Sequence, residues 1–138
     1  MLKTKDKILV VDDYLPDREA LEAAAAGQGD VQTAASLQEA ITMLGAQAFD
    51  LVVTDLRLNE DDTAGFQVLS AAKPGVPVIV VTRYPNQGRS RTAIAKGAFD
   101  FLDRSASGVD PIVMLQHKIM QALELRRARL LNHAGETR

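Results

Sequence analysis

The sequence feature that most constrains the fold is a repeated alternation between short apolar runs and longer stretches with helical periodicity. Short runs rich in valine, isoleucine and leucine indicate strands that are covered on both faces, as in a parallel sheet. The predicted strands are residues 8–11, 31–35, 51–54, 78–82 and 98–103. Because a helical stretch follows each run, the sequence predicts an α/β fold: a doubly wound five-stranded parallel sheet in a three-layer α/β/α sandwich.

Two helix starts carry local signals. Ser36 is predicted to cap the second helix, since Glu39 stands three residues later and completes a capping box. Asp110 followed by Pro111 predicts the start of the last helix, with aspartate as the cap and proline at the first helical position.

Size and composition restrict the classes of protein and partner. A chain of 138 residues suits one hydrophobic core, and its 46% apolar and 25% charged residues are typical of a folded soluble domain. The formal charge of −2 gives no general attraction to nucleic acid or to a membrane surface. Because the chain has no cysteine, disulfides and thiolate metal sites are excluded. We expect a cytoplasmic protein, since no apolar run is long enough for a signal peptide or a membrane span.

Polar side chains follow the predicted strands at the points where they end. Asp12 and Asp13 follow the first strand, Asp55 the third and Arg104 the fifth, while Thr82 ends the fourth. In an open parallel sheet these carboxyl ends form the ligand-binding crevice. Converging carboxylates raise one another's pKa unless a cation lies between them, and oxygen ligands without histidine or thiolate indicate Mg²⁺.

Each of these residues also has an ordinary structural interpretation. Asp12 or Asp13 alone could cap the following helix, and a lone Asp55 could form a turn. Thr82 alone could be a common strand residue and Arg104 a solvated surface charge. Their joint occurrence at successive strand ends favours a functional site.

Four segments, in order and spacing, resemble the receiver domains of bacterial two-component response regulators. The resemblance runs from about Lys7 to Leu125 and implies a flavodoxin-like sheet with strand order 2-1-3-4-5. The segments are ILVVDD, DLVVTDLRL, VIVVT and KGAFDFLDR.

The resemblance implies specific roles at the metal and acceptor site. Asp12, Asp13, Asp55 and the main-chain carbonyl of Arg57 would hold Mg²⁺, the implied cofactor. Asp55 would accept a phosphoryl group from a histidine kinase or a phosphotransfer protein. Positioning and charge neutralisation do most of the work in such a transfer, so the resemblance implies a signalling module and not an enzyme.

The resemblance also implies a switch. Thr82 would turn its hydroxyl towards the phosphoryl oxygens, and Phe101 would follow it inward by packing. Arg104 stands in place of the usual lysine. The face formed by the fourth helix, fifth strand and last helix would then bind an output domain or a second copy of the chain.

The sequence departs from the family pattern at three places. Arg104 and Ser105 replace the usual lysine and proline, and Arg83 replaces a small residue after the switch threonine. The loop RLNEDDTAG lacks the usual proline and reaches Gly65 two residues later than usual. These departures leave open a phosphorylation-independent pseudo-receiver that acts as a protein-binding module. An aspartyl phosphohydrolase is a third hypothesis, although the adjacent Asp12 and Asp13 lack its Asp-x-Asp pattern.

We expect a receiver domain over residues 1–125 and a C-terminal helical extension or linker over residues 126–138. The segment ALELRRARLL prolongs the last helix with leucines among arginines. It is compatible with a solvated helical tail and with a short coiled-coil linker, since fewer than three heptads are visible.

Overall fold

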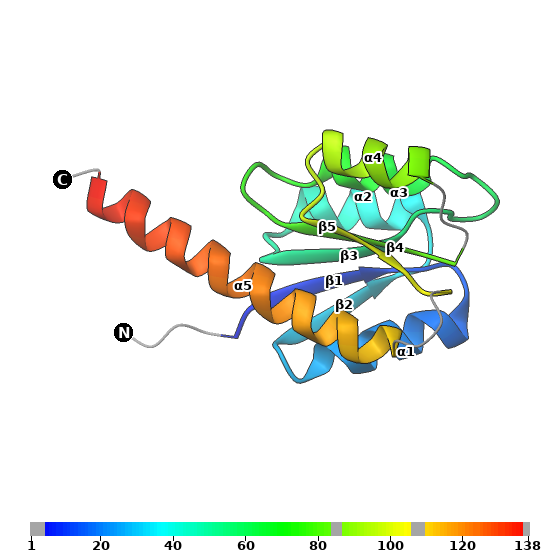
Figure 1. Cartoon of the computed structure of the whole chain (residues 1–138), viewed down its shortest axis with the longest axis horizontal. Helices are drawn as coiled ribbons and strands as arrows, with labels where there is room; N and C mark the ends of the chain where they lie inside the picture. The colour runs from blue at the N-terminus through cyan, green and yellow to red at the C-terminus, as the bar shows by residue number, and fades with distance from the viewer. Residues whose placement is uncertain (1–4, 84–86, 106–109, 137–138) are drawn as a thin grey trace.

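The computed structural model describes residues 5–83, 87–105 and 110–136. Within these residues, strands and helices alternate strictly along the chain (Figure 1). The strands are β1 Lys7–Val11, β2 Asp30–Ala34, β3 Leu51–Asp55, β4 Val78–Thr82 and β5 Asp100–Asp103. The helices are α1 Leu15–Ala26, α2 Leu37–Ala46, α3 Ala64–Ala71, α4 Gln87–Ala95 and α5 Pro111–Glu136.

All strand pairs are parallel, and the sheet order is β2-β1-β3-β4-β5, as the resemblance implied. The order of connection reverses between β1 and β3, which lie side by side although α1, β2 and α2 separate them in sequence. In their register Val11 is opposite Thr54. The residues that follow β1 therefore lie next to the end of β3, at the switch point where such sheets bind ligands.

Alternate side chains of each strand enter two cores, one on each face of the sheet. One core lies between the sheet and helices α1 and α5, and on β1 it includes Ile8 and Val10. The other lies between the sheet and helices α2, α3 and α4, and on β1 it includes Leu9 and Val11. Figure 1 shows these two helical layers on opposite sides of the sheet. The predicted three-layer sandwich is confirmed, and β4 is buried along its whole length.

The predicted helix caps form. The Glu39 N–H donates to Ser36 Oγ over 3.1 Å, and the Ile112 N–H donates to the Asp110 carboxylate over 2.9 Å. At α1 the structure departs from the simple capping interpretation. Tyr14 occupies the N-cap position and its side chain makes no capping hydrogen bond. Neither Asp12 nor Asp13 is therefore the N-cap residue of this helix.

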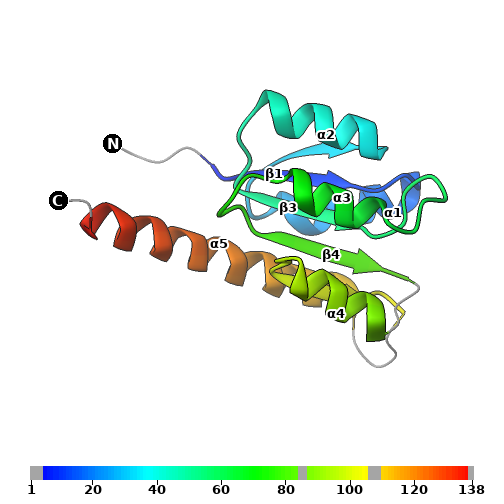
Figure 2. The ribbon, with the colours of Figure 1, turned by 90° about the horizontal axis from the view of Figure 1, so that it is seen from above.

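Helix α5 continues past the predicted domain end, and its C-terminal part projects beyond the sheet (Figures 1 and 2). Two consecutive arginines tie it to the opposite end of the sheet from the acidic residues. Arg126 contacts the carboxylate of Asp50 at 2.6 Å, and Arg127 pairs with the buried Asp6. We propose that the separate extension begins after these contacts and not at residue 126 itself.

Arg127→Gln is expected to lower the free energy of unfolding by about 1–2 kcal/mol, because it leaves the nearly inaccessible Asp6 carboxylate without this ionic partner. Urea unfolding measures the change. Arg129→Gln is the matched control, since Arg129 is exposed and no ion pair to it is found among the described residues. Equal stability of the two variants would contradict the anchoring role of Arg127.

None of the helices in the described part of the chain is both long and apolar enough to cross a membrane.

Candidate functional site

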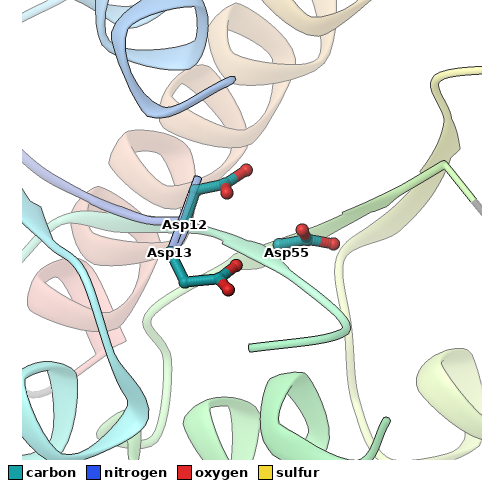
Figure 3. Close-up of side chains that lie close together, drawn as sticks. All are labelled: Asp12, Asp13 and Asp55. Carbon is teal, nitrogen blue, oxygen red and sulfur yellow. The ribbon is translucent and has the colours of Figure 1, made fainter. Parts of the chain in front are cut away.

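Three carboxylates meet at the ends of the two central strands. Asp12 and Asp13 directly follow β1, and Asp55 is the last residue of β3. One oxygen from each side chain lies within 4.8 Å of the others (Figure 3). The register of β1 and β3 brings Asp55 next to Asp12 and Asp13, although more than forty positions separate it from them in sequence.

The surroundings of these carboxylates oppose their negative charge. Burial raises the pKa of Asp12 to about 6, and the nearby carboxylates of Asp17 and Asp13 add to the rise. Burial also raises the pKa of Asp55 to about 7, with the charge of Asp12 as the next cause. Backbone hydrogen bonds act in the opposite direction, as the Tyr14 N–H donates to Asp12 Oδ1 over 2.9 Å. Because the carboxylates repel one another and are shielded from water by burial, a bound cation would be favourable at this cluster.

The donor set suits a hard divalent ion. The three side chains offer carboxylate oxygens at separations that one ion can span, and Mg²⁺ takes such oxygens together with water and phosphate oxygens. Arg57, whose main-chain carbonyl was predicted as a further ligand, lines the same pocket. Its backbone N–H hydrogen-bonds to the Asp55 carboxylate, which partly offsets the effect of burial on the pKa of Asp55.

A pocket of about 360 Å³ opens at these residues. A phosphoryl group and its coordinating ions are small enough to enter a space of this size. The lining residues are Asp13, Tyr14, Asp17, Asp55, Arg57, Glu60 and Arg83.

The loop after β3 folds back over the acidic pair. Leu58 and Asp61 form an isolated antiparallel bridge around Asn59 and Glu60, whose φ angles of 50° and 67° are left-handed. This geometry is that of a two-residue primed turn, which asparagine tolerates well. The Asn59 N–H donates to Asp13 Oδ2 over 3.0 Å, so the lengthened loop contacts the candidate metal site directly.

Of the other predicted site residues, Thr82 ends β4, Phe101 lies within β5 and Arg104 directly follows β5. Thr82 is buried at the end of β4, and its carbonyl accepts from the Arg104 N–H over 2.8 Å. Phe101 is half-buried, pairs with Val80 in the sheet and packs on the face covered by α2, α3 and α4. The Arg104 side chain is only 10% exposed, so it is not the solvated surface charge of the ordinary interpretation.

The structure adds one charged residue that sequence reasoning missed. Asp17, in the first turn of α1, accepts from Arg83 Nε at 2.9 Å and Nη2 at 2.5 Å. Arg104 Nη1 lies 3.5 Å from the same carboxylate. The hydrogen bonds from Arg83 lower the pKa of Asp17. An acidic residue in a first helical turn is common, so the sequence held no signal that this one pairs with residues after β4 and β5.

Comparison with known proteins agrees with this geometry. The family described as response regulator receiver domain matches residues 8–114. Over 97 residues the chain is 36% identical to the transcriptional regulatory protein ZraR of Escherichia coli, which covers 69% of this chain and 22% of that protein. Over 125 residues it is 31% identical to the response regulator protein PilR of Pseudomonas aeruginosa, covering 89% of this chain and 27% of that protein. The chain thus spans less than a third of the length of these curated relatives.

Solved structures show the same fold. A CheY-like receiver domain protein from Methanospirillum hungatei superposes with a TM-score of 0.78 at 24% identity, covering 91% of this chain and 99% of that chain. NtrX from Brucella abortus gives a TM-score of 0.79 at 25% identity, covering 98% of this chain and 30% of that chain. The family match, the strand order and the acidic switch-point site agree, and the chain belongs to the response regulator receiver domain family of two-component systems.

Proposed function

We propose that this chain is a phosphoacceptor receiver that takes a phosphoryl group on Asp55 and changes its protein contacts in response. The observation that carries the proposal is the convergence of Asp12, Asp13 and Asp55 within 4.8 Å at the switch point of the sheet. Asp55 lines the pocket and has backbone N–H groups directed at its carboxylate, so its position suits the acceptor.

The donor is a phosphohistidine of a histidine kinase or a phosphotransfer protein. An Asp55 carboxylate oxygen attacks the phosphorus atom, the new oxygen–phosphorus bond forms, and the nitrogen–phosphorus bond of the donor breaks. The imidazole nitrogen keeps the electron pair of that bond and takes up a proton. Asp12, Asp13, Asp55 and the Arg57 carbonyl would hold Mg²⁺, which would supply charge neutralisation for the transfer.

The phosphorylated site would act on the surrounding residues through its charge. The acyl phosphate brings about −1.5 to −2 charges, by analogy with phosphorylated side chains. The Thr82 hydroxyl and the guanidinium of Arg104 are the groups we assign to its new oxygens, and Phe101 is the residue that repacks. The face of α4, β5 and α5 then changes its affinity for a partner.

Two kinds of partner suit this face: an output domain of a longer regulator and a second copy of the chain. The similarity to ZraR, a transcriptional regulatory protein of which this chain covers 22%, favours the output domain. We place the reaction in the cytoplasm, where a kinase domain would meet the receiver. The receiver itself binds neither nucleic acid nor a membrane in this proposal, and it turns over no substrate as an enzyme does.

Incubation with acetyl phosphate and Mg²⁺ is expected to add the mass of one phosphoryl group to the intact wild-type protein. Asp55→Asn should stay unmodified, because the amide is no nucleophile towards phosphorus. Omitting Mg²⁺ should slow the wild-type reaction by about two orders of magnitude or more, since the charges at the site are then not neutralised. Equal modification of wild type and Asp55→Asn would refute the proposal.

The pseudo-receiver remains the alternative, and the contact that favours it is the pairing of Arg83 with Asp17 at the pocket. A pseudo-receiver would bind its partner equally well as wild type and as Asp55→Asn, with and without a chelator. Loss of partner binding in Asp55→Asn would decide against it.

A further inference from the structure

Asp17 holds two arginines at the edge of the acceptor pocket. Its side chain is 9% exposed and lines the same pocket as Asp13 and Asp55. The hydrogen bonds from Arg83 occupy both of its carboxylate oxygens, and Arg104 Nη1 lies within ion-pair distance of one of them. One buried carboxylate is therefore shared by two guanidinium groups from the ends of β4 and β5.

The two arginines differ in how well their donors are satisfied. Arg83 makes both hydrogen bonds to Asp17 and remains half exposed. Among the described residues, Nε and Nη1 of the buried Arg104 have no hydrogen-bond partner, although Nη1 lies in the field of Asp17. A largely buried guanidinium with unused N–H donors is poised to donate to an anionic oxygen.

We propose that Asp17 is an internal competitor of the phosphoryl group, holding Arg83 and Arg104 before phosphorylation and thereby weakening the site's affinity for the anion on Asp55. This inference rests on the proposed function and adds its regulation. A phosphoryl oxygen that draws the Arg104 guanidinium towards Asp55 therefore competes with the charge of Asp17. The negative charge of Asp17 at the pocket also repels the phosphoryl group. Its competition for the arginines and its charge therefore both lower the site's affinity for the anion.

The test uses beryllofluoride, a non-covalent stand-in for the phosphoryl group, at a Mg²⁺ concentration that saturates every variant. Its dissociation constant is read from the amide NMR shifts of the full chain. Asp17→Asn is expected to bind beryllofluoride about five- to tenfold more tightly than wild type, because the amide carries no charge and releases both guanidinium groups.

Glu60→Gln is the matched control for simple charge removal. Glu60 lines the same pocket and is exposed, and no ion pair joins it to either arginine among the described residues. Its substitution is expected to change the dissociation constant by about twofold or less, as for a solvated charge. Equal gains in beryllofluoride affinity in Asp17→Asn and Glu60→Gln would overturn the proposal, because loss of one negative charge at the pocket would then explain both.

Arg83→Gln supplies a second arm that keeps Asp17 charged and removes only a half-exposed side chain. Asp17 then pairs with Arg104 alone, so beryllofluoride should bind several-fold more weakly than to wild type. Adding Asp17→Asn in this background should restore affinity to the wild-type level or above. Unchanged or tighter binding by Arg83→Gln would overturn the proposal, even if Asp17→Asn does not fold. Absence of binding to wild type and all variants would instead refute the proposed function itself.

Discussion

Asp55→Asn is expected to stabilise the metal-free protein at pH 8, although it removes the proposed acceptor. Burial and the charge of Asp12 raise the pKa of Asp55 to about 7, so the ionised carboxylate is less favourable in the folded chain than in the unfolded one. An amide of the same size removes that penalty and still accepts from the Leu56 and Arg57 N–H groups. We expect a gain of about 1–3 kcal/mol, or roughly 4–10 °C in Tm, measured by thermal unfolding in a chelator.

The stability that Asp55→Asn gains over wild type should increase with pH. Below the ordinary aspartate pKa of 3.8 the carboxyl is neutral in both states, so Asn and Asp should be nearly equal in stability. As pH rises, the unfolded chain ionises first and the folded wild type loses stability relative to the variant. The difference should be complete above the folded-state pKa of about 7.

Two controls separate this effect from a general benefit of removing an acid. Saturating Mg²⁺ should narrow the gap, because bound metal stabilises the wild-type carboxylate. Asp61→Asn, in the same loop, should not gain stability, since hydrogen bonds from Thr63 lower the pKa of Asp61. A variant Asp55→Asn that is no more stable than wild type at pH 8 in the chelator would contradict the buried-charge account.

The layered fold was predictable because its signals are local. Fully buried strands such as β4 appear as continuous apolar runs, and the caps at Ser36 and Asp110 form through side-chain bonds within three residues. Strand ends were less accurate: β5 begins at Asp100 and not at residue 98, since Ala98 bonds back to Ala93 in the turn after α4. A turn of this kind has no apolar signature that separates it from a strand.

The acidic cluster was predictable for a topological reason, and the arginine contacts were not. Residues at the carboxyl ends of neighbouring parallel strands meet whatever their side chains are, so Asp12, Asp13 and Asp55 follow from strand order. The partner of Arg83 depends instead on which way a long side chain turns and on the position of α1. Such contacts depend on rotamers and packing, which periodicity does not encode.

Gly65→Val is expected to destabilise the protein by about 2–4 kcal/mol and to weaken Mg²⁺ binding. A Cβ at this position would lie 2.6 Å from Leu56 Cα and 2.7 Å from the Asp55 carbonyl oxygen, both of them backbone atoms. The Gly65 N–H also donates to the Leu56 carbonyl over 2.8 Å, so α3 and the end of β3 cannot separate without losing this bond. Backbone shifts at Asp55 and Leu56 would then displace the acceptor carboxylate.

Gly45→Ala is the matched control, because Gly45 lies within α2 and an added Cβ meets nothing within 4 Å. Alanine has the higher helix propensity, so this substitution in the last turn of α2 should stabilise the protein by about 0.5 kcal/mol. Urea unfolding of both variants checks that one loses stability and the other gains it, and Mg²⁺ titration checks that only Gly65→Val binds the ion more weakly. If Gly65→Val kept wild-type stability and Mg²⁺ affinity, the close packing of α3 on β3 could not be what holds Asp55 in place, and the lengthened loop alone would have to do so.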